Sequence, residues 1–194
     1  MTNDMRSIEL QNAVQFILAN LDDTRKVVRR AYGIRKQLAD LAISGKIYER
    51  DFYRITSLLY PQSRSAIWQN YFIKRHGAQK VKPADNRGDF QKNGNFYEYK
   101  SSGFNEDNAL HIVQIRLWQN CDYVIQSISD NGAITFMLDH EEMKYETEMS
   151  GATAAHGTRL VTEESQHIEL RMTIWQGSED WERWVDRYTN RTLK

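Results

Sequence analysis

Two carboxylates and one ammonium group stand close together in the middle of the chain, at Asp89, Glu98 and Lys100. Between them lies Asn93-Gly94, a dipeptide typical of a two-residue type I′ hairpin turn, because both central residues need a positive φ. A hairpin on this turn pairs Asp89 with Glu98, and it also pairs Phe90 with Tyr97, Gln91 with Phe96 and Lys92 with Asn95. Alternate residues of a strand share one face, so Lys100 projects beside Glu98. The spacing therefore predicts that Asp89, Glu98 and Lys100 meet at one point.

The chemistry that suits this trio is metal-assisted hydrolysis of a phosphodiester. Directly opposed strand residues have Cβ atoms about 4.5 to 5.5 Å apart, and two carboxylates there repel unless a cation lies between them. Mg²⁺ takes one or two protein carboxylates and keeps positions for water and phosphate. It polarises the phosphate and lowers the pKa of bound water, while a neighbouring ammonium can hold the water and offset charge on the phosphate. We expect Mg²⁺ as the cofactor, with Mn²⁺ able to substitute.

The sequence around the trio resembles a known nuclease motif. Gly88-Asp89, eight residues, then Glu98-Tyr99-Lys100 is similar to the core of the PD-(D/E)XK nucleases, and the chain as a whole resembles a type II restriction endonuclease. The resemblance implies that Asp89 and Glu98 bind the metal and that Lys100 assists the nucleophile. Gly88 departs from the Pro that often precedes the Asp. Gln69, on the helix expected before the hairpin, stands where many members have a metal-binding Glu.

The same three residues also allow a simpler interpretation. Asp89, Glu98 and Lys100 could form a solvated hairpin face with a surface salt bridge, which contributes little stability. Tyr97 and Tyr99 on the opposite face, and the flanking helices, favour the nuclease core instead. The Q-xxx-Y spacing of Gln119 and Tyr123 also resembles that of RecB-like nucleases.

The distribution of charge suggests where a polyanion could bind. The formal net charge is zero, but residues 1–100 hold 18 Lys and Arg against 10 Asp and Glu, and residues 101–194 hold 8 against 16. The basic half could face nucleic acid, because phosphate contacts dominate sequence-independent affinity. The two halves could equally attract each other within a monomer or across a dimer. The basic run over residues 25–36 is open to both a phosphate-contacting and a solvated-face interpretation.

Candidate DNA contacts lie on both sides of the predicted site. A basic cluster precedes the hairpin, a polar loop follows it, and a helix expected over residues 110–120 carries side chains suited to bases and phosphates. A small-residue loop over residues 150–158 contains a further candidate, a histidine. These candidates are Lys74, Arg75, Lys80, Lys82, Ser101, Ser102, Gln114, Arg116 and His156.

The hydrophobic pattern predicts an α/β fold. Helices are expected over residues 6–20, 22–44 and 47–60, and a fourth from Ser63 or Ser65 to Gly77. Later elements are strands over 123–129 and 134–138 around an Asp-Asn-Gly turn, a helix capped by Asp139, a strand over 167–175 and a helix from Ser178. We expect a helical N-terminal region, residues 1–60, packed on a PD-(D/E)XK-like core, residues 61–194. This core has a mixed sheet of about five strands flanked by helices.

Composition limits the class of protein. The chain has one cysteine, Cys121, which excludes an intrachain disulfide, and it lacks the Cys or His clusters of a zinc site. It has neither an apolar run of membrane-spanning length nor the apolar segment of a signal peptide, so a cytoplasmic location is expected.

These observations together predict Mg²⁺-dependent, sequence-specific cleavage of double-stranded DNA. A homodimer acting on a palindrome is expected, because two-fold symmetry in a protein matches two-fold symmetry in its site. A restriction enzyme implies a cognate DNA methyltransferase only as a genetic companion. The alternatives are a repair or structure-specific PD-(D/E)XK nuclease, and a catalytically inert DNA-binding or assembly protein.

Overall fold

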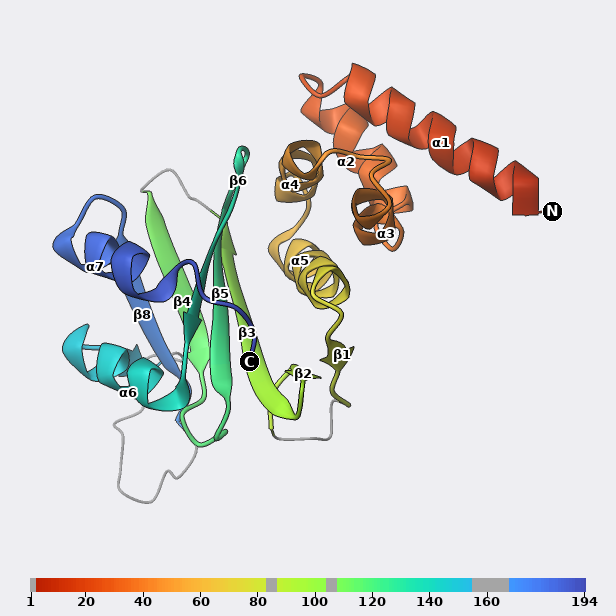
Figure 1. The fold of residues 1–194 in the computed structure, drawn as a ribbon. Helices are drawn as coiled ribbons and strands as arrows, with labels where there is room; N and C mark the ends of the chain where they lie inside the picture. The colour runs from red at the N-terminus through yellow and green to blue at the C-terminus, as the bar shows by residue number, and fades with distance from the viewer. Residues whose placement is uncertain (1–2, 83–86, 104–107, 155–167) are drawn as a thin grey trace. The chain divides into compact units, whose positions relative to one another are not determined.

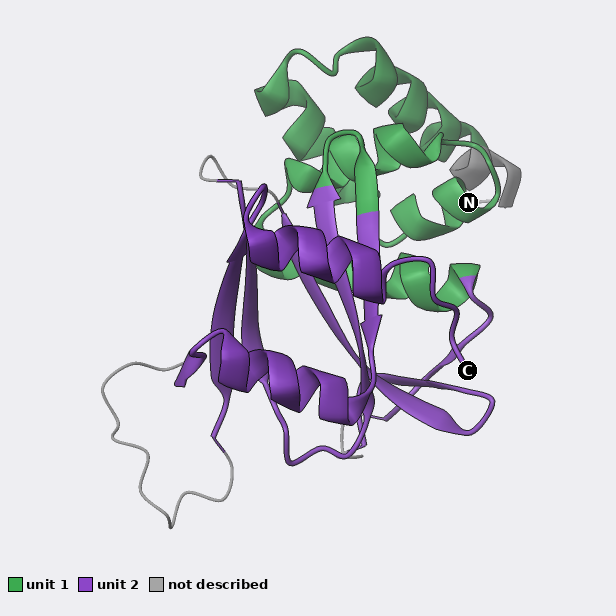
Figure 2. Ribbon diagram, turned by 60° about the vertical axis from the view of Figure 1, so that its left-hand side comes forward, with its two compact units in different colours: residues 1–75, 129–133 green, residues 76–128, 134–194 purple. Residues whose placement is uncertain are grey.

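The structure is a computed structural model that describes residues 3–82, 87–103, 108–154 and 168–194. The chain forms two compact units, residues 1–75 with 129–133 (unit 1) and residues 76–128 with 134–194 (unit 2), as coloured in Figure 2. Within the described ranges, no helix is both long and apolar enough to cross a bilayer.

The N-terminal part of unit 1, residues 3–75, is helical. Its helices are α1 (Asn3–Ala19), α2 (Thr24–Gly33), α3 (Leu38–Ile43), α4 (Glu49–Ser57) and α5 (Pro61–Arg75), shown in Figure 1. Asp23 caps α2 by accepting a hydrogen bond from the N–H of Lys26 at 3.2 Å. The single helix predicted over residues 22–44 is wrong, because the chain leaves helical geometry after Gly33, a poor helix former, and resumes as α3. The fourth predicted helix starts earlier than expected, at Pro61, where the missing N–H of proline has no cost.

The core of unit 1 is rich in aromatic side chains from α4 and α5. Phe52 and Tyr71 are buried, and their ring centroids lie 4.5 Å apart. Trp68 donates its indole N–H to Thr56 Oγ1 at 2.7 Å, and Thr56 in turn donates to the carbonyl of Phe52. The indole N–H of Trp68 and the hydroxyl of Thr56 are therefore both paired inside the core, which joins α4 to α5.

Unit 2 contains two β-sheets. The tip of one of their hairpins, residues 129–133, is part of unit 1. In the described chain the strands are β1 (Gln79–Lys80), β2 (Phe90–Lys92), β3 (Asn95–Gly103), β4 (Ala109–Ile115), β5 (Asp122–Ser129), β6 (Gly132–Leu138), β7 (Thr153–Ala154) and β8 (Leu170–Trp175). One sheet has the order β1-β2-β3-β5-β6 and the other β4-β8-β7. The β2–β3 pair is antiparallel and the β3–β5 pair is parallel, so the larger sheet is mixed, as predicted.

The helices of unit 2, α6 (His140–Met149) and α7 (Glu179–Tyr188), pack onto these sheets (Figure 1). A single apolar core contains buried residues from β4, β5, β6, β8, α6 and α7. Both helix starts agree with prediction. Asp139 and Glu142 form a capping box at α6, and Ser178 caps α7 by accepting the N–H of Trp181. The predicted mixed α/β fold is thus confirmed at this level.

A buried carboxylate links the two helices of unit 2. Glu146 of α6 is inaccessible to solvent and accepts hydrogen bonds from three α7 side chains. The donors are Arg183 Nη2 at 2.7 Å, Trp184 Nε1 at 2.9 Å and the Tyr188 hydroxyl at 2.6 Å. Burial alone would raise the pKa of Glu146, but these hydrogen bonds outweigh it and the pKa lies below its ordinary value.

The helix predicted over residues 110–120 is wrong, because residues 110–115 belong to strand β4 and residues 116–120 are not helical. Leu110 and Ile112 are buried and pair with Ile174 and Met172 of β8, which is the two-residue alternation of a strand. The register then shifts between Ile112 and Ile115, and Gln114 adopts a φ of 56°. The bulge interrupts the alternation of buried residues. The apparent helical spacing in the sequence came from Val113, which is exposed, and from Leu117, which lies beyond β4.

Candidate functional site

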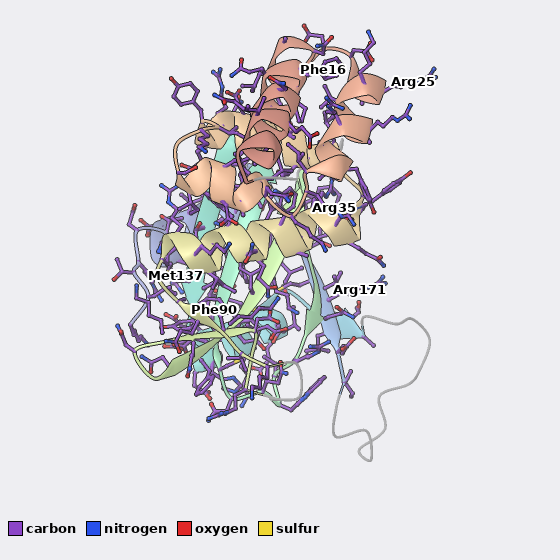
Figure 3. All side chains as sticks on the ribbon, turned by 90° about the vertical axis from the view of Figure 1, so that its right-hand side faces the viewer. Phe16, Arg25, Arg35, Phe90, Met137 and Arg171 are labelled. Carbon is purple, nitrogen blue, oxygen red and sulfur yellow. The ribbon has the colours of Figure 1, made fainter. Side chains whose placement is uncertain are left out.

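The hairpin that carries the predicted trio forms with the expected turn. Asn93 and Gly94 have φ values of 49° and 86°, as a type I′ turn requires. The strand partners are Phe90 with Tyr97, Gln91 with Phe96 and Lys92 with Asn95, which confirms the predicted register. The rings of Phe90 and Tyr97 stack with centroids 5.1 Å apart, and Phe90 is labelled in Figure 3. Both rings are buried, so the hairpin is anchored in unit 2 by its aromatic face.

Asp89 lies next to Glu98, although not as the simple ladder pair that the sequence predicts. The ladder ends at Phe90 and Tyr97. Beyond it, Asp89 donates its N–H to the carbonyl of Tyr97 at 2.8 Å, and its carboxylate accepts the N–H of Tyr99 at 2.9 Å. The backbone and side chain of Asp89 therefore hold the residues on either side of Glu98, which fixes the two carboxylates relative to each other.

Gly88 permits this arrangement. Its φ is +125°, a conformation that side chains strongly disfavour, and a Cβ placed there would lie 2.7 Å from the carbonyl oxygen of Tyr97. Proline, whose ring fixes φ near −65°, cannot adopt this backbone. The glycine that departs from the PD-(D/E)XK pattern is thus required by the close approach of β3.

Glu98 is a buried acid that forms an ion pair with a nearly buried lysine. The residue is 2% exposed, and its Oε1 accepts a hydrogen bond from Lys100 Nζ at 2.7 Å. Burial raises the pKa of Glu98, Lys100 lowers it and Asp89 raises it, and the net shift is upward. The alternative of a solvated hairpin face is wrong for Glu98 and Lys100, because both side chains are shielded from water.

Arg116, which directly follows strand β4 of the smaller sheet, places a second cation near Glu98. Its Nη1 lies 3.7 Å from Glu98 Oε1, and its Nε donates to Glu169 Oε1 at 2.9 Å. The sequence predicts Arg116 on a helix and does not single out Glu169. The two residues meet because Ile115 pairs with Leu170 across β4 and β8. Only that long-range pairing could have identified Glu169, since no local motif contains it.

The parallel neighbour β5 adds neutral groups to the site. Glu98 pairs with Tyr123 in the β3–β5 ladder, and Tyr123 is fully buried. Burial raises the pKa of its hydroxyl, which therefore stays protonated. Cys121 is buried as well, and burial raises the pKa of its thiol to about 12. Gln119, the other member of the Q-xxx-Y pair, is buried, and its Oε1 has no hydrogen-bond partner among the described residues.

The basic cluster expected before the hairpin is divided between the units. Lys74 and Arg75 of unit 1 form ion pairs with Asp40 and Glu49. These two cations are therefore already neutralised locally. Lys80 and Lys82 of unit 2 are exposed, and in the described chain no acid pairs with them.

The remaining candidates are dispersed. Ser101 and Ser102 belong to strand β3 and not to a loop, and Ser102 Oγ accepts the N–H of His111 at 3.2 Å. Gln114 is exposed on the bulge of β4. Gln69 is half-buried on α5 in unit 1. His156 lies outside the described residues.

The donor set at the hairpin suits a hard divalent cation. Asp89 and Glu98 supply carboxylate oxygens, which Mg²⁺ and Mn²⁺ prefer, and one or two such ligands are typical of Mg²⁺ sites. Such a cation would offset the repulsion between the two neighbouring carboxylates, one of which is buried and has a raised pKa. In the described residues no group of three or more His, Cys, Asp or Glu side chains is suitably placed for a metal. The carboxylate pair, Lys100 and Arg116 therefore constitute the candidate site.

Comparison with known proteins gives no assignment. No family model matches the chain, and neither does any curated protein or any solved structure.

Proposed function

We propose that this chain is a Mg²⁺-dependent endonuclease that hydrolyses phosphodiester bonds of double-stranded DNA. Within that class we propose a type II restriction endonuclease of PD-(D/E)XK type that acts as a homodimer. The observation that carries the proposal is the buried Glu98, which accepts a hydrogen bond from the Lys100 ammonium and lies near Asp89, whose carboxylate is bonded to the N–H of Tyr99 directly beyond Glu98. This is the grouping of two carboxylates and a cation that metal-assisted phosphoryl chemistry needs.

Asp89 and Glu98 would hold the metal. When bound, the ion supplies polarisation of the phosphate and a bound water of lowered pKa. The chain itself keeps the two carboxylates in place: the N–H of Tyr99 orients Asp89, and Glu98 of β3 is paired with Tyr123 of β5. Preorganised groups of this kind require little rearrangement during reaction.

Lys100 and Arg116 supply the positive charge. Lys100 Nζ lies 2.7 Å from Glu98 Oε1, where an ammonium can also donate to a water and offset charge on a phosphate oxygen. Arg116 lies between Glu98 and Glu169, with a guanidinium suited to phosphate oxygens. Both cations act in a partly shielded place, where electrostatic interactions are stronger than in water.

The burial of these charges supports a functional role over an inert charge cluster. A buried ion pair is a weak source of stability, because desolvation offsets the attraction between the charges. Glu98 has a raised pKa despite two nearby cations, which marks its ionised form as costly to the fold. Perturbed carboxylates of this kind concentrate at functional sites.

Cleavage of long duplex DNA tests the proposal. The purified protein is incubated with phage-length DNA in Mg²⁺, in Mn²⁺ and in EDTA. Discrete fragments that require the metal are expected of a restriction enzyme. Cleavage that depends on damage, ends or branch points would move the assignment to a repair or structure-specific nuclease. Intact DNA under every condition, with DNA from several sources, would contradict the proposal.

A further inference from the structure

The surface of α2 in unit 1 carries an unusual excess of cations. Over residues 25–36 the chain has six Lys and Arg and no Asp or Glu. Lys26 forms an ion pair with Asp23 at 2.8 Å. In the described chain no acid pairs with the other cations, which are Arg25, Arg29, Arg30, Arg35 and Lys36.

The placement of these cations is unfavourable for the helix by itself. Arg25 and Arg29 are spaced i, i+4, as are Lys26 and Arg30, and like charges at this spacing repel each other. All four are exposed, while Val27 and Ala31 form the buried side of α2. The extra positive charge therefore does not serve packing. It is expected to be neutralised by something outside the described chain.

A groove of about 1200 Å³ adjoins these cations. Lys26, Arg29 and Arg30 line one side, and Asn12, Phe16 and the single acid Glu9 of α1 line the other. Phe16 is 39% exposed and lies under the guanidinium of Arg30, 5.7 Å from ring centroid to Cζ. Arg35 similarly covers the exposed ring of Tyr32 at 4.3 Å. Figure 3 labels Phe16 of α1, Arg25 of α2 and Arg35 of the turn after α2.

We propose that the α1/α2 surface of unit 1 is a second nucleic-acid contact, which binds the phosphate backbone of duplex DNA without reading its sequence. Cations spread along α2 and the following turn match a polymer with regularly repeated charge better than a single anion. Arginine is the cation best suited to phosphate, because its planar fork donates to two oxygens at once. The inference shares duplex DNA with the proposed function but does not depend on catalysis.

The salt dependence of DNA binding tests this inference directly. Binding of a 30-base-pair duplex to the full chain is measured by fluorescence anisotropy in EDTA, where no cleavage occurs, at several salt concentrations. The triple variant Arg25→Gln, Arg29→Gln, Arg30→Gln is compared with the matched triple Lys46→Gln, Arg50→Gln, Lys144→Gln, whose members are exposed elsewhere. The slope of log K against log salt is negative, and each lost phosphate contact lowers its magnitude by about 0.9.

The α2 triple is expected to lower the magnitude of the slope by about two to three, equally for unrelated DNA sequences, while the matched triple changes it much less. Equal slopes for the two triples, or no binding of duplex DNA by the unmodified chain, would overturn the inference. A reduced slope without any cleavage in Mg²⁺ would support this surface and refute the nuclease. Cleavage in Mg²⁺ with an unchanged slope would support the nuclease and refute this surface. Circular dichroism of both triples confirms that they are folded.

Discussion

The carboxylate of Asp89 accepts the backbone N–H of Tyr99 at 2.9 Å, directly beyond Glu98 on strand β3. Asp89 thus has two roles, a structural hydrogen bond and a proposed part in metal binding, and substitutions can distinguish them. Asp89→Asn keeps an acceptor for Tyr99 but loses the charge. We expect it to fold with a similar melting temperature and to lose cleavage by about a hundredfold or more. Asp89→Ala should in addition lose about 1 to 3 kcal/mol of stability, because the N–H of Tyr99 is left unpaired. Full cleavage by Asp89→Asn would contradict the metal-binding role.

Position 88 should not tolerate proline, the residue that often precedes the Asp in the PD-(D/E)XK pattern. Gly88→Ala places a Cβ 2.7 Å from the Tyr97 carbonyl oxygen, in addition to the cost of a positive φ. Gly94→Ala is the matched control, since Gly94 also has a positive φ but no atom within 4 Å of its Cβ position. Urea unfolding should show about 1 kcal/mol lost at position 94 and clearly more at 88, with Gly88→Pro the worst. Equal losses at both glycines would show that the close approach is unimportant.

Glu98 gives a pH dependence with a defined sign. The pKa of Glu98 is higher in the folded chain than its ordinary value of 4.5, mainly because of burial. The folded state therefore binds this proton more tightly, and wild-type stability falls as pH rises through the interval between the two pKa values. Glu98→Gln cannot titrate there.

Unfolding free energies measured from pH 4 to pH 8 should show wild type losing stability relative to Glu98→Gln as pH rises. The loss amounts to about 1.4 kcal/mol for each unit of pKa shift. Glu148→Gln, an exposed substitution on α6, is the control and should show no such trend. If wild type instead gained stability relative to Glu98→Gln as pH rises, folding would lower the pKa of Glu98, which would contradict the upward shift.

Glu146 should be a major source of stability in unit 2. Glu146→Ala leaves Arg183, Trp184 and Tyr188 without their shared acceptor. Removing one partner of a buried ionic group costs about 3 to 5 kcal/mol. Glu148→Ala, on the exposed side of the same helix, should change stability by less than about 0.5 kcal/mol. Thermal unfolding of the two variants measures the difference, and similar melting temperatures would refute the role of Glu146.

The sequence predicted the local features of this fold best. The Asn93-Gly94 turn determines the hairpin register, and Asp139 and Ser178 determine the starts of α6 and α7, because turns and caps depend on neighbouring residues. The strand β4 was not predictable in the same way. The helical spacing of Leu110, Val113 and Leu117 is misleading, because Val113 is exposed and Leu117 lies beyond the strand, and only pairing with β8 reveals β4.

In the candidate site, too, the local contacts were predictable from the sequence and the long-range contacts were not. Asp89, Glu98 and Lys100 meet because a local hairpin places them together, and local spacing was enough to predict this. The burial of Glu98 and its contacts with Arg116 and, through it, Glu169 depend on how β3, β4 and β8 pack together. Side chains separated by 53 positions, such as Arg116 and Glu169, are brought together by tertiary structure, which no motif in the sequence encodes.

The most direct measurement of the central claim is DNA cleavage by Lys100→Ala in parallel with DNA binding by the same variant. Lys144→Ala, which removes an exposed lysine of unit 2, is the matched control. We expect Lys100→Ala to lose cleavage in Mg²⁺ by about 10² to 10³, the usual cost of removing one group that stabilises transition-state charge. DNA affinity in EDTA should stay close to that of wild type, and Lys144→Ala should cleave normally. Undiminished cleavage by Lys100→Ala would contradict the placement of the chemistry at this hairpin.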